Sequence, residues 1–161
     1  MKLPRKTLAA IVVAMLIGLT VAGGISMSSS SGETVMPVVS AVAGEAPTIT
    51  KPEGKAPTEL TTEDVIVGTG AEVLPTSTLT VHYTLMAWST GKIIESSWSG
   101  QPATFPLAGV VEGWQKGLPG AKVGGRRVLI LPPSMGYGAA GSGPIGPNET
   151  LIFSVDIIGV S

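Results

Sequence analysis

The sequence predicts an α+β domain in which a bent antiparallel β-sheet wraps around one short α-helix. The chain has 22 Gly and 13 Pro among its 161 residues, which favours many short elements joined by turns over a helical bundle. Several stretches have the length, branching or alternation of strands, whereas a single segment has a helical pattern. A sheet with only one helix to cover it buries one face against that helix.

The amino terminus predicts a signal peptide or a membrane anchor over residues 1–27. Three basic residues and no acid lie in the first six positions, ahead of an uncharged apolar run from Leu8 to Val21. This run is shorter than the ~20 residues of a membrane-spanning helix, although a weaker apolar continuation through residues 8–27 reaches that length. Cleavage and retention of the segment both remain open. Either one makes the rest of the chain extracytoplasmic, as a secreted or a membrane-anchored protein.

Residues 28–60 are expected to form a flexible Ser/Pro-rich linker. Four consecutive Ser begin the segment, and four Pro are scattered among Ala, Thr, Glu and Lys. No period of 2 or 3.6 residues is sustained there, so the pattern indicates neither a strand nor a helix. The folded domain is therefore predicted over residues 61–161, which is long enough for one modest core.

The clearest strand prediction is Thr78 to Leu85, because its side chains alternate in character. The apolar face carries Leu79, Val81, Tyr83 and Leu85, and the other face carries Thr80, His82 and Thr84. We expect His82 to face solvent. Further strands are predicted at Arg126–Leu131 and Leu151–Val160, which are rich in branched residues, and at the shorter segments Val65–Val67, Lys92–Ser96 and Ala103–Leu107.

The only predicted helix is Val111 to Leu118, and it is barely two turns long. Its two glycines, Gly113 and Gly117, lower its intrinsic helical propensity.

Composition excludes several classes of function. The chain has no Cys, which excludes disulfides, thiolate catalysis and Cys-ligated zinc. With His82 as the single histidine, a His-rich metal site and a Ser-His-Asp triad are not expected. Beyond residue 6 the chain carries 7 basic and 11 acidic residues, so no basic field attracts nucleic acid. We expect no cofactor, no metal and no nucleic-acid partner.

Five of the seven aromatic residues come from four predicted strands or loops and from the helix. They are Tyr83, Phe105, Trp114, Tyr137 and Phe153. Core filling explains such a scatter in most small domains, but Tyr and Trp also carry polar groups that need partners when they are buried. On pattern alone, a packed core and a ring-lined pocket both remain open.

From Val65 to Val160 the sequence resembles the FKBP family of peptidyl-prolyl isomerases. Each matching piece is short, but their order and spacing together are highly specific. The matching residues are Val81-His82-Tyr83-Thr84, Gly91-Lys92, Glu95-Ser96-Ser97, Phe105-Pro106-Leu107, Glu112-Gly113-Trp114, Gly117-Leu118, Lys122 to Arg127, Pro132-Pro133, Gly136-Tyr137-Gly138 and Thr150 to Phe153.

The resemblance implies an FKBP-like fold with a shallow apolar pocket that accepts a proline ring, and Trp114 as the pocket floor. By position, the catalytic residues are Tyr83, Glu95, Val111 and Tyr137, with the Val111 backbone N–H and the Tyr137 hydroxyl donating to substrate. Substrate-binding residues are Ile94, Phe105, Val110, Trp114, Ile145 and Phe153.

The implied activity is isomerisation of X-Pro peptide bonds in unfolded, exported polypeptides, without a cofactor. Implied ligands also include macrolides such as rapamycin or tacrolimus. The alternative is a proline-peptide binding or chaperone module with little turnover. Three departures motivate it: Ile94-Glu95 where strong drug binders of the family have Phe-Asp, Ala103 in place of a bulky aromatic, and a shorter loop over residues 139–147.

Overall fold

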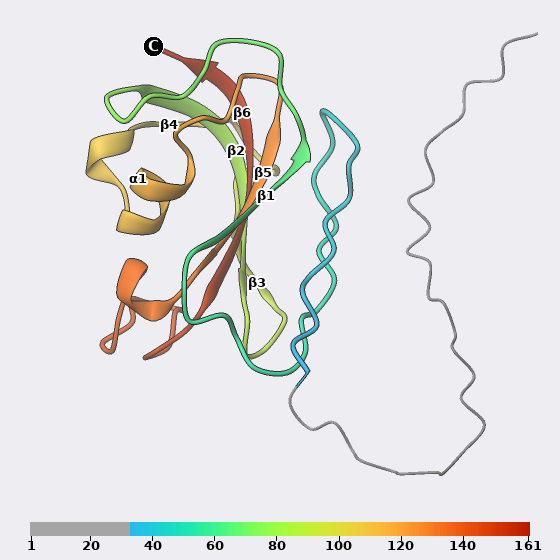
Figure 1. The fold of residues 1–161 in the computed structure, drawn as a ribbon, viewed down its shortest axis with the longest axis vertical. Coiled ribbons are helices and arrows are strands. Elements are labelled where there is room, and N and C mark those ends of the chain that lie inside the picture. Colours follow the sequence, from blue (N-terminus) through green and yellow to red (C-terminus); the bar gives the residue numbers. More distant parts are fainter. Residues whose placement is uncertain (1–32) are drawn as a thin grey trace, which may run out of the picture.

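The computed structural model describes residues 33–161, which are built on one six-stranded antiparallel sheet (Figure 1). Its strands follow the order β1-β5-β6-β2-β3, and β4 also pairs with β2. Their bounds are β1 Thr61–Ile66, β2 Thr78–Ala87, β3 Ile93–Ser96, β4 Ala103–Pro106, β5 Arg126–Leu131 and β6 Leu151–Val160. The bounds predicted for β5 and β6 are confirmed. The strand predicted at Val65–Val67 is observed as β1, which begins earlier, at Thr61, and ends at Ile66, so that Val67 lies outside it.

Side-chain alternation gives the sheet an inner and an outer face. On the inner face, Leu85 lies opposite Phe153, which lies opposite Leu129. These side chains belong to a buried core that also contains Trp114. The predicted apolar face of β2 is therefore confirmed as the core face. The inner face thus arranges its side chains around the helix.

Helix α1, Glu112–Gly117, packs on the inner face against β5 (Figure 1). Gly113 and Gly117 allow this close approach. A Cβ atom on Gly113 would overlap the Leu131 side chain, and one on Gly117 would lie 2.8 Å from Leu129 Cδ2. The predicted helix is confirmed, and its two glycines bring Trp114 down onto the sheet.

Residues 33–55 form a hairpin on the outer face of the sheet, which differs from the linker expected there (Figure 1). Its two arms meet in the bridges Val35–Glu53 and Val39–Ile49. Val39 is buried in an apolar cluster with outer-face side chains of the sheet. That cluster contains Val39, Met86, Trp88, Val128, Ile130 and Ile152, with Ile49, Ala56 and Val65 packed against it. Burial of this apolar surface is the physical reason why the segment packs on the domain.

A buried arginine fastens the tip of the hairpin. Arg126 is fully buried, and its guanidinium forms two hydrogen bonds with Asp156, of 2.7 and 2.9 Å. The same group donates to the carbonyl oxygens of Ser40, at 2.6 Å, and Glu45, at 2.5 Å. One side chain therefore satisfies a buried carboxylate and holds the turn of the hairpin.

His82 lies on the outer face as predicted, but it is half-buried and does not simply face solvent. Its Nδ1 lies 2.9 Å from Ser97 Oγ, and its ring stacks on Trp98 with a centroid distance of 4.2 Å. The Trp98 indole, which covers the histidine, had no recognisable signal in the sequence.

The signal peptide or membrane anchor predicted for residues 1–27 lies outside the described residues. Within residues 33–161, no helix is both long and apolar enough to cross a membrane.

Candidate active site

An apolar pocket of about 430 Å³ lies between the inner face of the sheet and helix α1. It is open to solvent on one side, and eight different elements or loops contribute to its walls. The lining residues are Tyr83, Leu85, Glu95, Phe105, Gly109, Val110, Val111, Trp114, Tyr137 and Phe153. Apolar and aromatic side chains with a few polar groups are typical of small-ligand sites.

Trp114 forms the floor of the pocket, and three aromatic rings surround it. Its ring centroid lies 5.7 Å from that of Tyr83, 6.0 Å from that of Phe105 and 5.3 Å from that of Phe153. The interplanar angles are 80° to 87°, so all three contacts are edge-to-face. These contacts fix the rotamers of the rings, and the pocket is therefore shaped before any ligand enters.

One polar feature of the pocket is a hydrogen-bonded pair of a tyrosine and a carboxylate. The Tyr83 hydroxyl donates a 2.6 Å hydrogen bond to Glu95 Oε1. Burial raises the pKa of the Tyr83 phenol above its ordinary value, and the hydrogen bond to Glu95 and the charge of that carboxylate raise it further. Tyr83 is therefore a neutral donor at physiological pH.

Val111 supplies a backbone donor at the rim of the pocket. It is the residue before helix α1, with an extended ψ of 149°. Its carbonyl accepts hydrogen bonds from Trp114 and Gln115, at 3.0 and 3.3 Å. Among the hydrogen bonds of residues 33–161, none uses the Val111 N–H, so this donor is free to bind a ligand carbonyl.

Tyr137 is positioned by a tight turn after the short helical turn η2, Pro133–Met135. Gly138 adopts a positive φ of 62°, and its N–H donates to the Pro133 carbonyl at 2.8 Å. A residue with a Cβ atom would be strained in this conformation. The ring of Tyr137 lines the pocket while 38% of the residue remains exposed, so its hydroxyl lies within reach of a ligand.

The structure brings together eight of the ten residues predicted for the site. Ile94 and Ile145 do not line the pocket but pack against or within the inner core. Two lining residues, Leu85 and Gly109, had not been predicted. Leu85 could have been found, since it shares the face of β2 that carries Tyr83, whereas nothing in the sequence distinguishes Gly109 from the other glycines.

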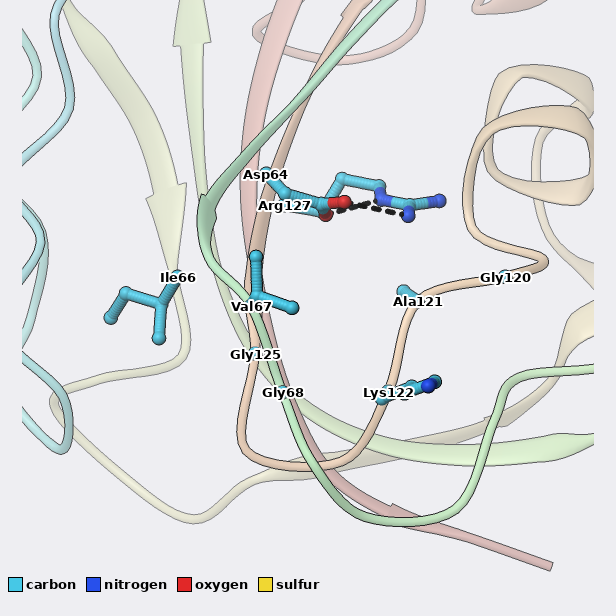
Figure 2. Close-up of a pocket in the computed structure, with 9 residues that line it drawn as sticks. All are labelled: Asp64, Ile66, Val67, Gly68, Gly120, Ala121, Lys122, Gly125 and Arg127. Atoms are coloured by element: carbon cyan, nitrogen blue, oxygen red, sulfur yellow. Dashed lines mark hydrogen bonds and ion pairs between the residues drawn. The ribbon is translucent and has the colours of Figure 1, made fainter.

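A second hollow, of about 230 Å³, lies beside β1 and the turn before β5 (Figure 2). There Arg127 forms a two-pronged ion pair with Asp64, at 2.7 and 3.0 Å. Arg127 also donates to the carbonyls of Gly117 and Pro119. Lys122 also lines the hollow and forms no ion pair among the described residues. Because Asp64 and Arg127 satisfy each other, their ion pair leaves a ligand little charge to bind. We assign a structural role to it.

Comparison with known proteins agrees with the pocket. Residues 70–158 match the family model described as FKBP-type peptidyl-prolyl cis-trans isomerase. The chain belongs to this family. It is an FKBP-type isomerase whose matched region contains the complete pocket. It is 48% identical over 115 residues to a "Probable FK506-binding protein" of Corynebacterium glutamicum, covering 71% of this chain and 98% of that protein.

Further relatives of this FKBP-type isomerase support the same family assignment. An "FK506-binding protein" of Streptomyces anulatus is 42% identical over 121 residues, covering 72% of this chain and 98% of that protein. The crystal structure of FkpA from Escherichia coli superposes with a TM-score of 0.61 at 37% identity, covering 66% of this chain and 51% of that chain. The crystal structure of AtFKBP13 superposes with a TM-score of 0.60 at 31% identity, covering 66% of this chain and 96% of that chain. The FKBP-like fold and the peptidyl-prolyl isomerase function predicted from the sequence are thereby confirmed.

Proposed function

We propose that this FKBP-type isomerase rotates X-Pro bonds of exported polypeptides in the pocket above Trp114. The observation that carries the proposal is the ring of edge-to-face aromatic contacts around that indole. It forms a preshaped apolar surface of the kind that a proline ring fills. Proline-containing segments are the proposed substrates, and rapamycin or tacrolimus are proposed to occupy the same surface.

The mechanism follows from the electronic structure of the peptide bond. Resonance gives the C–N bond partial double-bond character and a rotation barrier of ~18–20 kcal/mol. Twisting the bond removes this resonance and reduces its charge separation. An apolar pocket that excludes water therefore disfavours the planar ground state relative to the twisted state. No nucleophile has to attack the substrate in this reaction.

The free donors of the pocket suit the twisted amide. We assign the Val111 N–H to a substrate carbonyl, because no acceptor among residues 33–161 uses it. The Tyr137 hydroxyl, which also belongs to the pocket lining, is the second proposed donor. Hydrogen bonds that strengthen as the amide twists lower the barrier further.

The decisive experiment measures cis-trans exchange of an X-Pro peptide by NMR with the purified protein. We expect acceleration of exchange, and competitive inhibition when rapamycin or tacrolimus occupies the pocket. Peptide binding without acceleration would instead support the alternative, a binding or chaperone module. Acceleration that neither macrolide inhibits would refute the macrolide part of the proposal.

Replacement of Tyr137 by Phe should lower kcat/KM about three- to ten-fold and leave the free energy of unfolding nearly unchanged. The change removes one hydroxyl from a partly exposed ring, and a hydrogen bond is typically worth ~0.5–1.5 kcal/mol. Exchange NMR and urea denaturation of the same preparation measure the two effects. Unchanged kcat/KM would remove Tyr137 from the site.

We expect kcat/KM to stay constant within about two-fold from pH 6 to pH 8, with a solvent deuterium isotope effect near unity. Carboxyl and phenol groups line the pocket, and both ordinarily titrate well outside this range. The pKa of Tyr83 is raised, so its phenol keeps its proton throughout. His82 is on the outer face, away from the pocket lining. A bell-shaped profile that the His82→Gln variant flattened would contradict this mechanism.

Export is the remaining part of the proposal. It is supported by the basic residues and the apolar run at the amino terminus, which have the order of an export signal. Protease accessibility in intact cells tests it, and a cytoplasmic, protected domain would refute it. Mass spectrometry of the mature amino terminus distinguishes a cleaved signal from a retained anchor over residues 8–27.

A further inference from the structure

The isomerase pocket contains a single side chain that is charged at neutral pH. Of its ten lining residues, Glu95 is the only acid, and no Lys, Arg or His lines the pocket. A charge at the edge of an apolar surface acts on whatever occupies that surface. The carboxylate therefore influences which residues can flank a bound proline.

The carboxylate of Glu95 has spare capacity for a ligand. Among residues 33–161, its one side-chain hydrogen bond comes from the Tyr83 hydroxyl, which occupies Oε1. The ion pairs of the described residues all use other acids. They are Lys116 with Glu112, Arg126 with Asp156, and Arg127 with Asp64. The charge of Glu95 is thus not neutralised within the described part of the chain, and Oε2 can accept a further donor.

The location of Glu95 limits the size of the effect. Glu95 is solvent-exposed on strand β3, so water and salt screen its charge. Pairs between exposed charges are typically worth less than ~1 kcal/mol, which is about five-fold in a rate or an equilibrium. The rest of the chain beyond position 6 acts in the same direction, since without Glu95 it carries 7 basic and 10 acidic residues.

We propose that Glu95 makes this isomerase prefer X-Pro segments in which a Lys or Arg flanks the proline, and disfavour those in which an Asp or Glu does. The inference deepens the proposed function and rests on the same pocket. The aromatic floor holds the proline, while the carboxylate on the rim selects the charge of the neighbouring residue.

The test uses peptides that differ only in the residue before proline, which is Lys, norleucine or Glu, and a second set varied after proline. Exchange NMR measures kcat/KM without a coupling protease, whose own specificity would distort the comparison. We expect the Lys peptide of at least one set to exceed the Glu peptide by about five-fold at low salt. The ratio should fall below about two-fold in 1 M salt, where the Debye length is about 3 Å.

Glu95→Gln is the diagnostic variant, because the amide oxygen can still accept from Tyr83 while the charge is removed. It should reduce the Lys-to-Glu ratio to about one. Glu63→Gln is the matched control, since it makes the same charge change at an exposed position of strand β1, away from the pocket lining, and should keep the full ratio.

Three outcomes would overturn an assignment, and they are distinguishable. If the wild-type protein accelerates none of the peptides, the proposed function itself fails. If it accelerates all of them equally, the function stands and the charge preference is refuted. If the preference survives Glu95→Gln, it originates from other acids of the domain and the role of Glu95 is wrong.

Discussion

Replacing Trp114 by Ala should abolish measurable isomerase activity and lower the free energy of unfolding by about 3–5 kcal/mol. Trp114 is 3% exposed and contacts the rings of Tyr83, Phe105 and Phe153 edge-to-face. The substitution therefore removes the pocket floor and opens a cavity in the core at the same time. Since small domains are stable by only ~5–15 kcal/mol, the loss is a large part of the total.

A milder pair of variants separates the two effects. Trp114→Phe keeps an aromatic ring in the core but shortens the floor, so we expect a folded protein with clearly reduced kcat/KM. Trp88→Phe is the matched control, because Trp88 is a buried tryptophan of the outer face. It should lose stability and keep its turnover. Equal turnover in the two variants, measured on fully folded protein, would contradict the assignment of Trp114 to the site.

The second large effect is expected from Arg126→Met, which should destabilise the domain by about 3–5 kcal/mol. The variant leaves the Asp156 carboxylate buried without its cation and frees the hairpin carbonyls of Ser40 and Glu45. An unpaired buried charge is far more costly than an absent one. Urea denaturation measures the loss, and limited proteolysis should cut first within residues 33–55.

A double variant tests this explanation. Combining Arg126→Met with Asp156→Leu removes the orphaned charge, so much of the lost stability should return. Lys116→Met is the control, because its pair with Glu112 has both side chains more than half exposed, and its loss should change stability by less than ~0.5 kcal/mol. If the double variant is no more stable than Arg126→Met alone, the buried charge is not the cause.

Local pattern predicted much of this sheet and little of what covers its outer face. Alternation in β2 and branched residues in β5 and β6 depend on each strand alone, so they can be recognised without knowing its neighbours. The hairpin over residues 33–55 is different. Its arms meet at only two bridges, and its anchor, Arg126, is 81 to 86 residues away in sequence. A periodic pattern of apolar residues within one segment cannot indicate contacts with residues so far away in sequence.

The pocket shows the same division. Eight lining residues followed from their positions in the family pattern, whereas Ile145 packs in the core and Ile94 packs against it. A pattern of residue types does not resolve whether a side chain at such a position faces the pocket or the core. Gly109 enters the lining because its backbone passes the pocket. A backbone segment that lines a pocket cannot be recognised from the types of its residues.

The two glycines of helix α1 have a consequence for how the enzyme fails. A six-residue helix with Gly113 and Gly117 has too little intrinsic stability to persist when it is detached from β5. The helix carries Trp114, so local melting of this one element would dissolve the pocket floor while most of the sheet remained paired. Heat would then inactivate the enzyme before it unfolded the sheet, and cooling would restore activity as quickly as the helix docks again. The temperature at which activity is lost would thus depend on how firmly this six-residue helix docks on β5. Stabilising other parts of the sheet would not raise that temperature.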